Sequence, residues 1–560
     1  MTATVDHHDD PPAAGAPREV PAEVRSRRSM LALAGVESGR LLRHPAVLVA
    51  TTLSVWVLWR WGNGTVPVLH YADIATQFPL APLAAAALLA ANLAVLRPHR
   101  DGAVDLYGAT RLSLARRTLA HLLSVLPLAA LGGVLVAADL AWLAGVPGRV
   151  GTPNLAEAAT GPALIVLAGW LGVLLGRVWR SVAVAPLVLV VVAVGSLTLA
   201  DLYVGGHDQR PWVWLGTLLR PVTIDPPPAA LLGRPATWHL VYLLGAAVVL
   251  GALAVWRSQA QARAPRRPRA VTGAVLVAAL AVTAVAAVTQ TRPTSPALAA
   301  RRLAAASNPA AHQVCQRRGP AVYCVFPGFE PQIGLWEPTV RAVLAGVPPA
   351  AAARAVPVTV AQRIGWPRLF TDDAFLTADQ GHGDRGDRPV APVGTAWGRD
   401  GQALATSQAR LAGNVAARVT EQADQVQQPS GEQPKSSVGS AAEPPPPNVG
   451  CNARAVVALW LAARASPHVA VGLRQQVTDA RFAFIAFPND VDSDDVVWGV
   501  REAELALALL ERPSDQVTQT LWRHWDLLTS PATTLERLGE LMGAQPPPHR
   551  ASAPDIGPTC

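Results

Sequence analysis

Long apolar segments constrain this 560-residue chain more than any other feature. Each is about the length that a helix needs to cross roughly 30 Å of hydrocarbon. Apart from the strands of a closed β-barrel, only a helix can cross the lipid bilayer, because a helix satisfies its backbone amide and carbonyl groups within its own segment. We therefore expect an α-helical polytopic membrane protein with about seven transmembrane helices. The segments lie at residues 44–59, 80–96, 119–143, 158–176, 182–200, 238–256 and 271–289.

Composition agrees with a membrane protein. Charged residues make up only 15% of the chain and mean hydropathy is +0.26, which excludes a disordered acidic or basic protein. The apolar segments of about 20 residues exclude a wholly soluble one. The net charge is +8, and Lys435 is the only lysine, so the positive charge is almost entirely arginine. The arginines fall between apolar segments without a continuous basic stripe, so we expect no nucleic-acid partner.

Arginine is distributed unequally between alternate loops. Cytoplasmic loops carry the excess of positive charge, so we expect a plasma-membrane protein with a cytoplasmic N-terminus and everything after residue 289 outside. The richer set holds Arg18, Arg25, Arg27, Arg28, Arg40, Arg43, Arg97, Arg100, Arg111, Arg116, Arg117, Arg177, Arg180, Arg257, Arg263, Arg266, Arg267 and Arg269. The poorer set holds Arg60, Arg149, Arg210, Arg220 and Arg234.

The same patterns predict the domain organisation. An interfacial helix should carry Glu37, Arg40 and Arg43 on one polar stripe. The expected units are a disordered cytoplasmic N-terminus (1–28), this interfacial helix (29–43), a six-span core (44–256), a basic cytoplasmic loop (257–270), the seventh span (271–289) and an extracytoplasmic domain (290–560) with a disordered loop at 426–449.

The outer domain should open with a hinge, residues 290–309, and then a small β-hairpin. Folding about the turn-forming residues 318–321 sets Cys315 opposite Cys324, so we expect a disulfide on the oxidising side, two buried thiols being the alternative. The rest of the domain should be mostly helical. Expected helices lie at 451–465, 498–511, 515–529 and 534–543, the last with a Thr533 to Glu536 capping box. Whether Cys451 pairs with Cys560 stays open.

Polar and small residues inside the spans are few. We expect Asn92 and Asp139 each to make a helix-to-helix hydrogen bond or to serve as an interfacial anchor, and not to carry protons. Gly169, Gly172 and Gly176 line one side of the fourth span, which suits close helix packing, either within the chain or at a dimerisation or gating face.

Common catalytic motifs are missing. Lys435 follows Pro434, so the chain has no Walker loop, and it has no His-Glu-x-x-His, Cys-x-x-Cys or Gly-x-Ser-x-Gly motif. The acidic groups at 379–387 and 490–495 fit solvated turns and caps better than metal sites. We expect no catalytic residue, cofactor or metal in this chain.

Two stretches carry a family resemblance. Residues 37–45, Glu-Ser-Gly-Arg-Leu-Leu-Arg-His-Pro, resemble the opening of membrane (permease) subunits of type-two ABC exporters, especially actinobacterial ones. Residues 91–102, ending in Arg-Asp-Gly, and 112–123, with Arg116, Arg117 and Thr118, are similar to the loop after the second span in that family. The seventh span and the outer domain are additions to a minimal permease.

The resemblance implies a permease that forms a translocation pathway as a homodimer or a heterodimer with a second permease. It also implies a separate ATP-binding subunit at the cytoplasmic face. The residues expected to couple to that subunit are Glu37, Arg40, Arg97, Arg100, Asp101, Arg116 and Arg117. Simple positive-inside anchoring would account for the arginines equally well, though not for Asp101-Gly102.

Two other functions fit the sequence. An integral-membrane glycosyltransferase would use an acidic residue of the first outer loop as its base, where His70, Tyr71 and Asp73 lie. Alternatively, the spans would anchor an outer sensing or wall-binding domain without transport.

Overall fold

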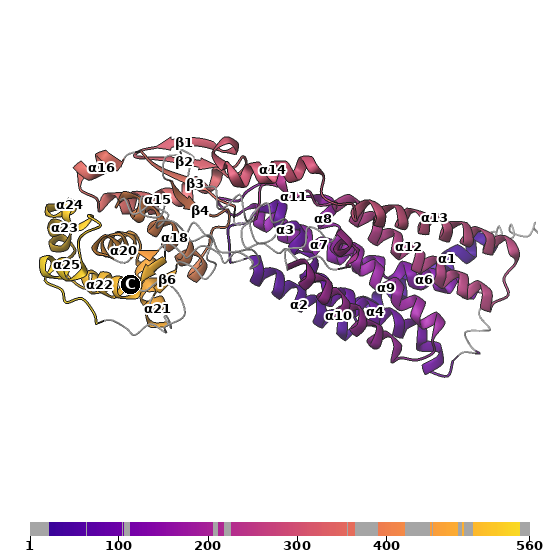
Figure 1. The fold of residues 1–560 in the computed structure, drawn as a ribbon. Coiled ribbons are helices and arrows are strands. Elements are labelled where there is room, and N and C mark those ends of the chain that lie inside the picture. Colours follow the sequence, from indigo (N-terminus) through magenta and orange to yellow (C-terminus); the bar gives the residue numbers. More distant parts are fainter. Residues whose placement is uncertain are drawn as a thin grey trace, which may run out of the picture.

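The structure is a computed structural model that describes residues 22–62, 64–103, 105, 112–204, 211–217, 226–355, 357–364, 390–420, 449–450, 452–479, 484–486 and 497–548. It is elongated, with a helical bundle at one end and a mixed domain at the other (Figure 1). Several sequence-based expectations lie outside the described residues: Cys451, Cys560, most of the loop 426–449 and the acidic groups at 379–387 and 490–495.

Each of the seven predicted apolar segments is helical. The helices are α2 (Pro45–Gly62), α4 (Gln77–Arg100), α6 (Leu114–Ser124) continued by α7 (Leu126–Ala144), α9 (Thr160–Val178), α10 (Val184–Val204), α12 (Ala236–Gln261) and α13 (Arg266–Gln290).

Five or six of these, rather than seven, are long and apolar enough to cross a membrane, counting the described residues. The sixth is α2 together with α1 (Ala22–Leu42), a pair bent by 60°, and the apolar part of α10 is shorter than a full span. The α1 helix begins at Ala22, so residues 22–28 are helical where the sequence predicted disorder.

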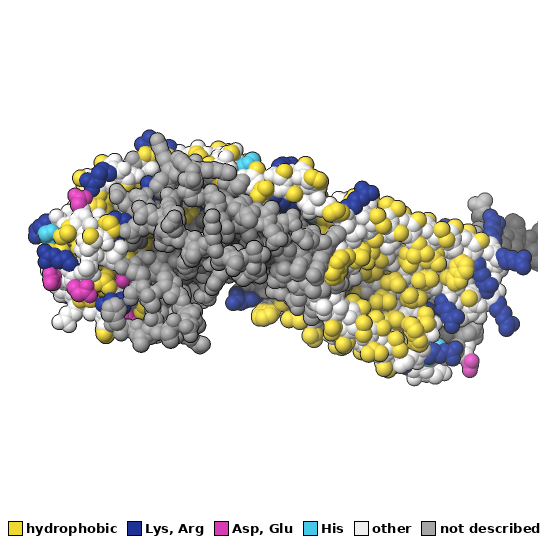
Figure 2. All heavy atoms as spheres, viewed as in Figure 1, with side chains coloured by type: hydrophobic (Ala, Val, Ile, Leu, Met, Phe, Trp, Pro, Cys, Tyr) yellow, Lys and Arg dark blue, Asp and Glu magenta, His cyan; other side chains and the backbone are white. Residues whose placement is uncertain are grey.

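The α4 helix forms the centre of the bundle and packs mainly against α9 and α2, while α13 lies outermost against α12. Apolar side chains on α13 such as Val277 and Val288 are about two-thirds exposed, as expected of a surface that faces lipid. Figure 2 shows hydrophobic side chains spread over the bundle, with arginines gathered at the end far from the mixed domain.

Loops that the sequence assigned to opposite sides of the membrane separate to opposite ends of the bundle. The short helices α3 (Leu69–Ala75), α8 (Leu155–Ala158) and α11 (Ala229–Leu232) lie beside the mixed domain (Figure 1). The arginine-rich loops lie at the other end. A multi-pass membrane protein follows, with the mixed domain on the arginine-poor side.

The mixed domain begins with α14 (Pro296–Ser307), which is a helix where the sequence predicted a hinge. Ser295 caps it by accepting the amide N–H of Leu298, and Pro296 occupies its first turn, a position where proline is well tolerated. The short 3-10 turn η2 (Pro309–His312) leads from it into the first sheet.

The predicted hairpin and its disulfide are confirmed. Strand β1 (Val314–Arg318) pairs antiparallel with β2 (Ala321–Val325), and Cys315 is bonded to Cys324 directly opposite. Gly319 takes the turn with φ +57°, a conformation that favours glycine. The hairpin lies at one edge of a four-stranded sheet. Strand β2 also pairs in parallel with β3 (Val358–Gln362), and β3 pairs in parallel with β4 (Ala391–Val393).

Helices make up most of the remaining domain, as predicted. Helix α20 (Ala453–Ala465) is buried around its whole circumference from Ala453 to Ala463, which places it at the centre. Around it lie η3 (Glu330–Gln332), α15 (Ile333–Ala345), α16 (Pro349–Ala355), α18 (Gly401–Val419), α21 (Pro467–Asp479), α22 (Val500–Leu510), α23 (Ser514–Arg523), α24 (Trp525–Leu528), α25 (Leu535–Met542) and the small sheet of β5 (Val449–Gly450), β7 (Val497–Gly499) and β6 (Phe484–Ala486).

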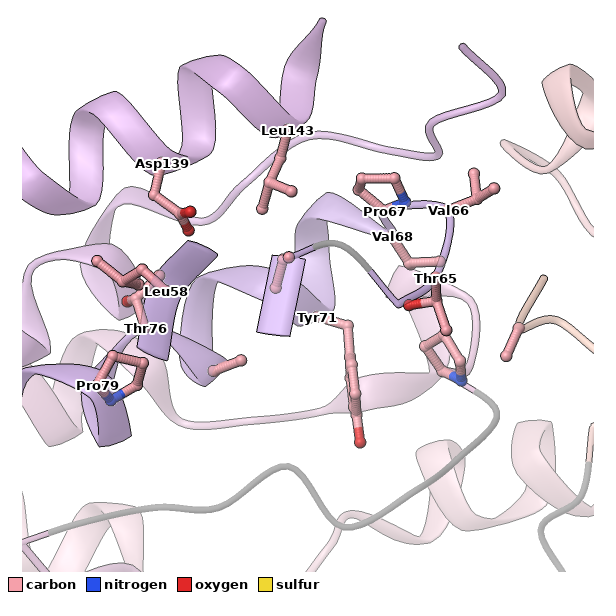
Figure 3. A pocket seen from close by; sticks show the side chains of 15 residues that line it. Leu58, Thr65, Val66, Pro67, Val68, Tyr71, Thr76, Pro79, Asp139 and Leu143 are labelled. Carbon is pink, nitrogen blue, oxygen red and sulfur yellow. The ribbon is translucent and has the colours of Figure 1, made fainter. Parts of the chain in front are cut away.

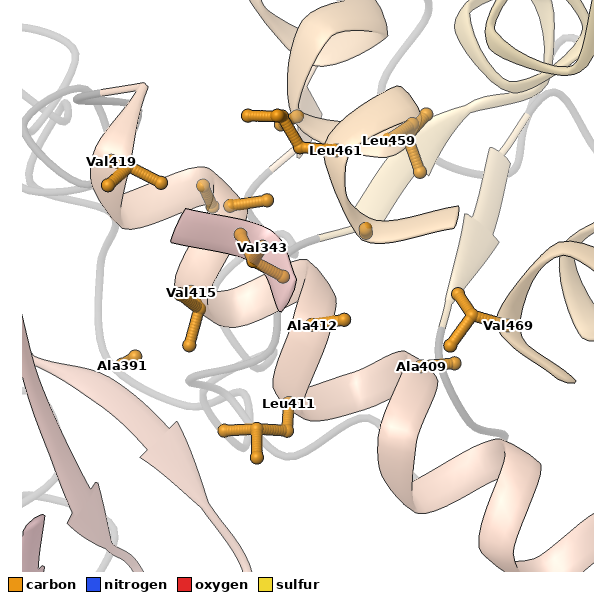
Figure 4. Packing of buried hydrophobic residues seen from close by; sticks show 14 of the residues in the cluster. Val343, Ala391, Ala409, Leu411, Ala412, Val415, Val419, Leu459, Leu461 and Val469 are labelled. Atoms are coloured by element: carbon orange, nitrogen blue, oxygen red, sulfur yellow. The ribbon is translucent and has the colours of Figure 1, made fainter. Parts of the chain in front are cut away.

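Small side chains let these helices approach closely. Figure 4 shows Ala412 and Val415 of α18 packed near Val343 of α15 and Leu461 of α20. At α25 the capping residue is Thr534, whose hydroxyl accepts the amide N–H of Arg537, and not Thr533 as predicted.

The core of the mixed domain extends into the loops of the bundle. One continuous hydrophobic cluster joins Val66, Val68 and Val150 of those loops to Phe329 and Trp336 of the domain. The mixed domain and the loops of the bundle therefore share one hydrophobic core.

Candidate functional site

A buried ion pair links the two stretches that carry the family resemblance. Glu37 of α1 is 3% exposed, and Arg97 of α4 donates from Nη1 to both of its carboxylate oxygens, at 2.9 and 3.1 Å. Arg40 donates to the same carboxylate at 2.8 Å, although its own side chain is half exposed. The expected polar stripe is therefore wrong for Glu37, which turns inward because Arg97 offers it a partner.

The α1 helix is fixed to the bundle along its length. It packs chiefly against α6, where the Ser38 hydroxyl lies 3.3 Å from the carbonyl of Ser124 and Arg116 donates to the hydroxyl of Ser26. These contacts and the Glu37 pair make α1 part of the bundle's arginine-rich end.

The other predicted coupling residues surround this pair at lower burial. Arg100 and Asp101 are exposed where α4 ends, and Gly102 has φ +64°, so the Asp-Gly sequence provides the turn out of α4. Arg116 and Arg117 lie half-buried in the first turn of α6, where Arg117 donates to the carbonyl of Leu112.

Two further residues, His121 and Arg177, belong to this charged end, and the sequence did not place either of them beside Arg97. His121 of α6 lies close to Arg97, Arg117 and Arg177, the last in the final turn of α9. The sequence identified Arg177 only as an arginine of a cytoplasmic loop. Its neighbours in the cluster come from helices distant in sequence, so the cluster itself could not be predicted. The cluster is strongly positive, with Glu37 as its buried acid, and so favours acidic groups of a partner or of lipid.

A second buried charge cluster lies at the opposite end of the bundle. Arg234 lies 3.1 Å from Glu157 and 3.7 Å from Asp73, and its side chain is 9% exposed. It also donates to the carbonyl of His70, whose ring is 2.9 Å from the carbonyl of Pro227. These contacts hold the three outer loops together.

The residues predicted for a glycosyltransferase belong to this second cluster. Asp73 is fully buried, and its two oxygens accept the backbone N–H groups of Ile74 and Asn154, each at 2.7 Å. The Tyr71 ring lies 5.9 Å from the Arg234 guanidinium carbon. Asp73 thus organises the loops instead of facing a substrate.

The mixed domain is joined to these loops by backbone pairing. The Val66 amide donates to Trp397 at 2.7 Å, the Arg399 amide donates to Gly64 at 3.2 Å, and Thr65 bridges to Gly398. The Arg399 guanidinium lies 4.8 Å from the centre of the Trp142 ring of α7.

Beside this junction lies a cavity of about 270 Å³ (Figure 3). Its walls come from α2, α3, the start of α4, α7 and the loops at Pro226 and Ala396. Asp139 points into it, beside Leu58, Thr76 and Pro79.

The three glycines of α9 face neighbouring helices of the same chain. A Cβ on Gly172 would lie 2.2 Å from the Leu88 carbonyl oxygen of α4, and one on Gly169 or Gly176 would meet Val125 or Val95. Asn92 donates to the Gly172 carbonyl at 3.3 Å across the same contact, so it makes a helix-to-helix hydrogen bond.

Within the described residues, no group of three or more His, Cys, Asp or Glu side chains is arranged to hold a metal. No protein-family model, curated protein or solved structure matches this chain.

Proposed function

We propose that this chain is the transmembrane subunit of an ATP-driven ABC exporter, which forms the translocation pathway and couples to a separate ATP-binding subunit. The pair between Glu37 and Arg97 carries the proposal, because it joins the two stretches that resemble such permeases. This pair, almost fully buried on the Glu37 side, connects α1 to the end of α4.

The charges around that pair suit a protein partner. Arg100 and Asp101 are exposed, and the Arg40 side chain is half exposed, so a partner with a complementary surface has access to them. The energy must come from elsewhere, since the sequence has no Walker loop. The partner subunit would hold the ATP, and a second permease, identical or different, would complete the pathway.

The two alternatives gain less support. A glycosyltransferase base has to reach its substrate, and Asp73 is buried and held by two backbone amides and Arg234. The anchor hypothesis agrees with the backbone pairing at the junction, and positive-inside anchoring accounts for the arginines at the other end, but it gives no role to the exposed Asp101 or to the buried Glu37.

The test uses affinity purification in mild detergent, followed by mass spectrometry of the proteins that co-purify. We expect an ATP-binding protein with a Walker loop to co-purify with the wild-type chain, and the double variant Arg100→Glu, Asp101→Arg to lose it. Arg149→Glu, an exposed change at the opposite end, is the matched control and should retain it. Retention by the double variant would contradict the proposed interface.

Orientation has its own test. Lys435 is the only lysine, so an amine reagent that cannot cross membranes has one side-chain target. We expect this reagent to label Lys435 in intact cells from which any outer layer has been removed. Labelling only after the membrane is broken would place the mixed domain in the cytoplasm and contradict the proposed direction of the chain.

A further inference from the structure

The cavity beside α7 contains an acid that has no counter-charge among the described residues. Of the described residues that line the cavity, Asp139 is the only charged one. Thr65, Tyr71 and Thr76 contribute hydroxyl groups, and the other walls are apolar or backbone. Figure 3 shows the Asp139 carboxylate directed into this space.

Asp139 differs from the neighbouring acids of the same end. Asp73 and Glu157 share Arg234 as their cation. Asp139 makes no ion pair within the described part of the chain, and Arg399, which reaches the same end of α7, stacks on Trp142 instead. An acid within a membrane helix is costly and normally has a partner or a function.

We propose that this cavity binds a small hydrophobic cation. The positive group would lie against the Asp139 carboxylate, and the apolar part would pack against side chains such as Leu58, Val66, Pro79 and Leu143. Apolar walls strengthen the attraction between the two charges because they exclude water. A volume of about 270 Å³ suits a small molecule and is too small for a peptide or a whole lipid.

The position of the cavity gives the occupant a structural effect. Ala396 belongs to the mixed domain, whereas Leu58, Thr76 and Asp139 belong to the bundle. A bound cation therefore contacts both parts and should stabilise their junction. This binding requires only the present chain, so it is independent of the proposed ATP-binding subunit.

The test measures binding of tritiated phenethyltrimethylammonium to the full chain in lipid nanodiscs, with empty nanodiscs as background. Its permanent charge removes any titration of the ligand. The competitors are the unlabelled cation, its neutral carbon analogue (3,3-dimethylbutyl)benzene and the anion 4-phenylbutyrate. The variants are Asp139→Asn, which removes the charge at constant size, Ala75→Phe, which fills the cavity, and Glu511→Gln, the same acid-to-amide change at an exposed position outside the cavity, as a control.

We expect saturable binding that only the unlabelled cation displaces. Asp139→Asn should weaken it by about tenfold or more, as for other close charge pairs. Ala75→Phe should also weaken it although the acid remains, and Glu511→Gln should leave it unchanged. Equal competition by the neutral analogue, unchanged binding in Asp139→Asn, or no saturable binding to the wild-type chain would overturn the proposal. The competition needs no variant, so it decides the matter even if Asp139→Asn does not fold.

Discussion

Arg97 on α4 donates hydrogen bonds from Nη1 to both carboxylate oxygens of Glu37 on α1, which lies 60 residues earlier in the sequence. The carboxylate is almost fully buried, whereas Arg97 is one-third exposed, so the pair lies at the edge of the bundle interior. It fixes the first helix to the central one at the end where the arginines gather.

Glu37→Gln should destabilise the bundle by about 1 to 3 kcal/mol, because it removes the charge that Arg97 and Arg40 share at a buried position. The measurement is the thermal unfolding midpoint in detergent. Arg40→Gln is the control and should lower the free energy of unfolding by less than about 0.5 kcal/mol, because the Arg40 side chain is half exposed to solvent. Equal midpoints for wild type and Glu37→Gln would show that the pair does not hold α1.

Gly172→Ala should disrupt the contact between α9 and α4. The added methyl group would lie 2.2 Å from the backbone oxygen of Leu88, which cannot move without shifting α4. We expect a loss of about 1 to 3 kcal/mol in stability, typical of overpacking. Gly195→Ala in α10 is the matched control, because nothing lies within 4 Å of that site. A monodisperse, equally stable Gly172→Ala protein would contradict this packing.

The Cys315 to Cys324 bond should stabilise the mixed domain by about 2 to 3 kcal/mol, since it closes a loop between two residues that are nine positions apart in the unfolded chain. Reduction, or the double change to serine, should lower the unfolding midpoint of that domain. Mass analysis should find both cysteines protected from alkylation before reduction and modified after it. Free alkylation of both without reductant would mean that the bond does not form in the cell.

Glu502 predicts a pH dependence for the mixed domain. It lies on α22 at 2% exposure, and burial raises its pKa above the ordinary value of 4.5. The folded state therefore holds this proton to higher pH than the unfolded chain does, so stability falls as pH rises from about 4.5 through the raised pKa.

Denaturation of Glu502→Gln across pH 4 to 8 measures this effect. The variant should lose that component of the pH dependence, becoming more stable than wild type at neutral pH and similar to it at pH 4. Glu511→Gln, an exposed change one residue beyond the same helix, should behave like wild type. A wild-type advantage at neutral pH would show that the Glu502 carboxylate has a stabilising partner.

The sequence revealed features that depend on local chemistry. Each apolar segment could be assigned as helix because lipid leaves no alternative, and the hairpin followed from Gly319 between two short strands. Helix α18 was missed because its buried positions hold Ala412, Ala416 and other small residues that give no clear apolar periodicity.

Long-range partners could not be predicted in the same way. Glu37 resembles any acid on a surface helix until Arg97 is placed beside it. The same holds for Arg234 with Glu157, and for β3, which joins β2 in parallel from more than 30 residues away. In the candidate sites, residue type suggested the charged end. The pairing of Glu37 with Arg97, and the place of Asp139 in a cavity with no ion-pair partner among the described residues, could be seen only in the fold.

We propose that this membrane chain couples at its arginine-rich end to a subunit that hydrolyses ATP. The most direct measurement is the ATPase rate of the co-purified subunit in nanodiscs, alone, with the wild-type chain, and with the Arg100→Glu, Asp101→Arg chain. We expect only the wild-type chain to change the rate. An identical rate in all three samples, or the absence of any ATP-binding protein from the purified material, would contradict it.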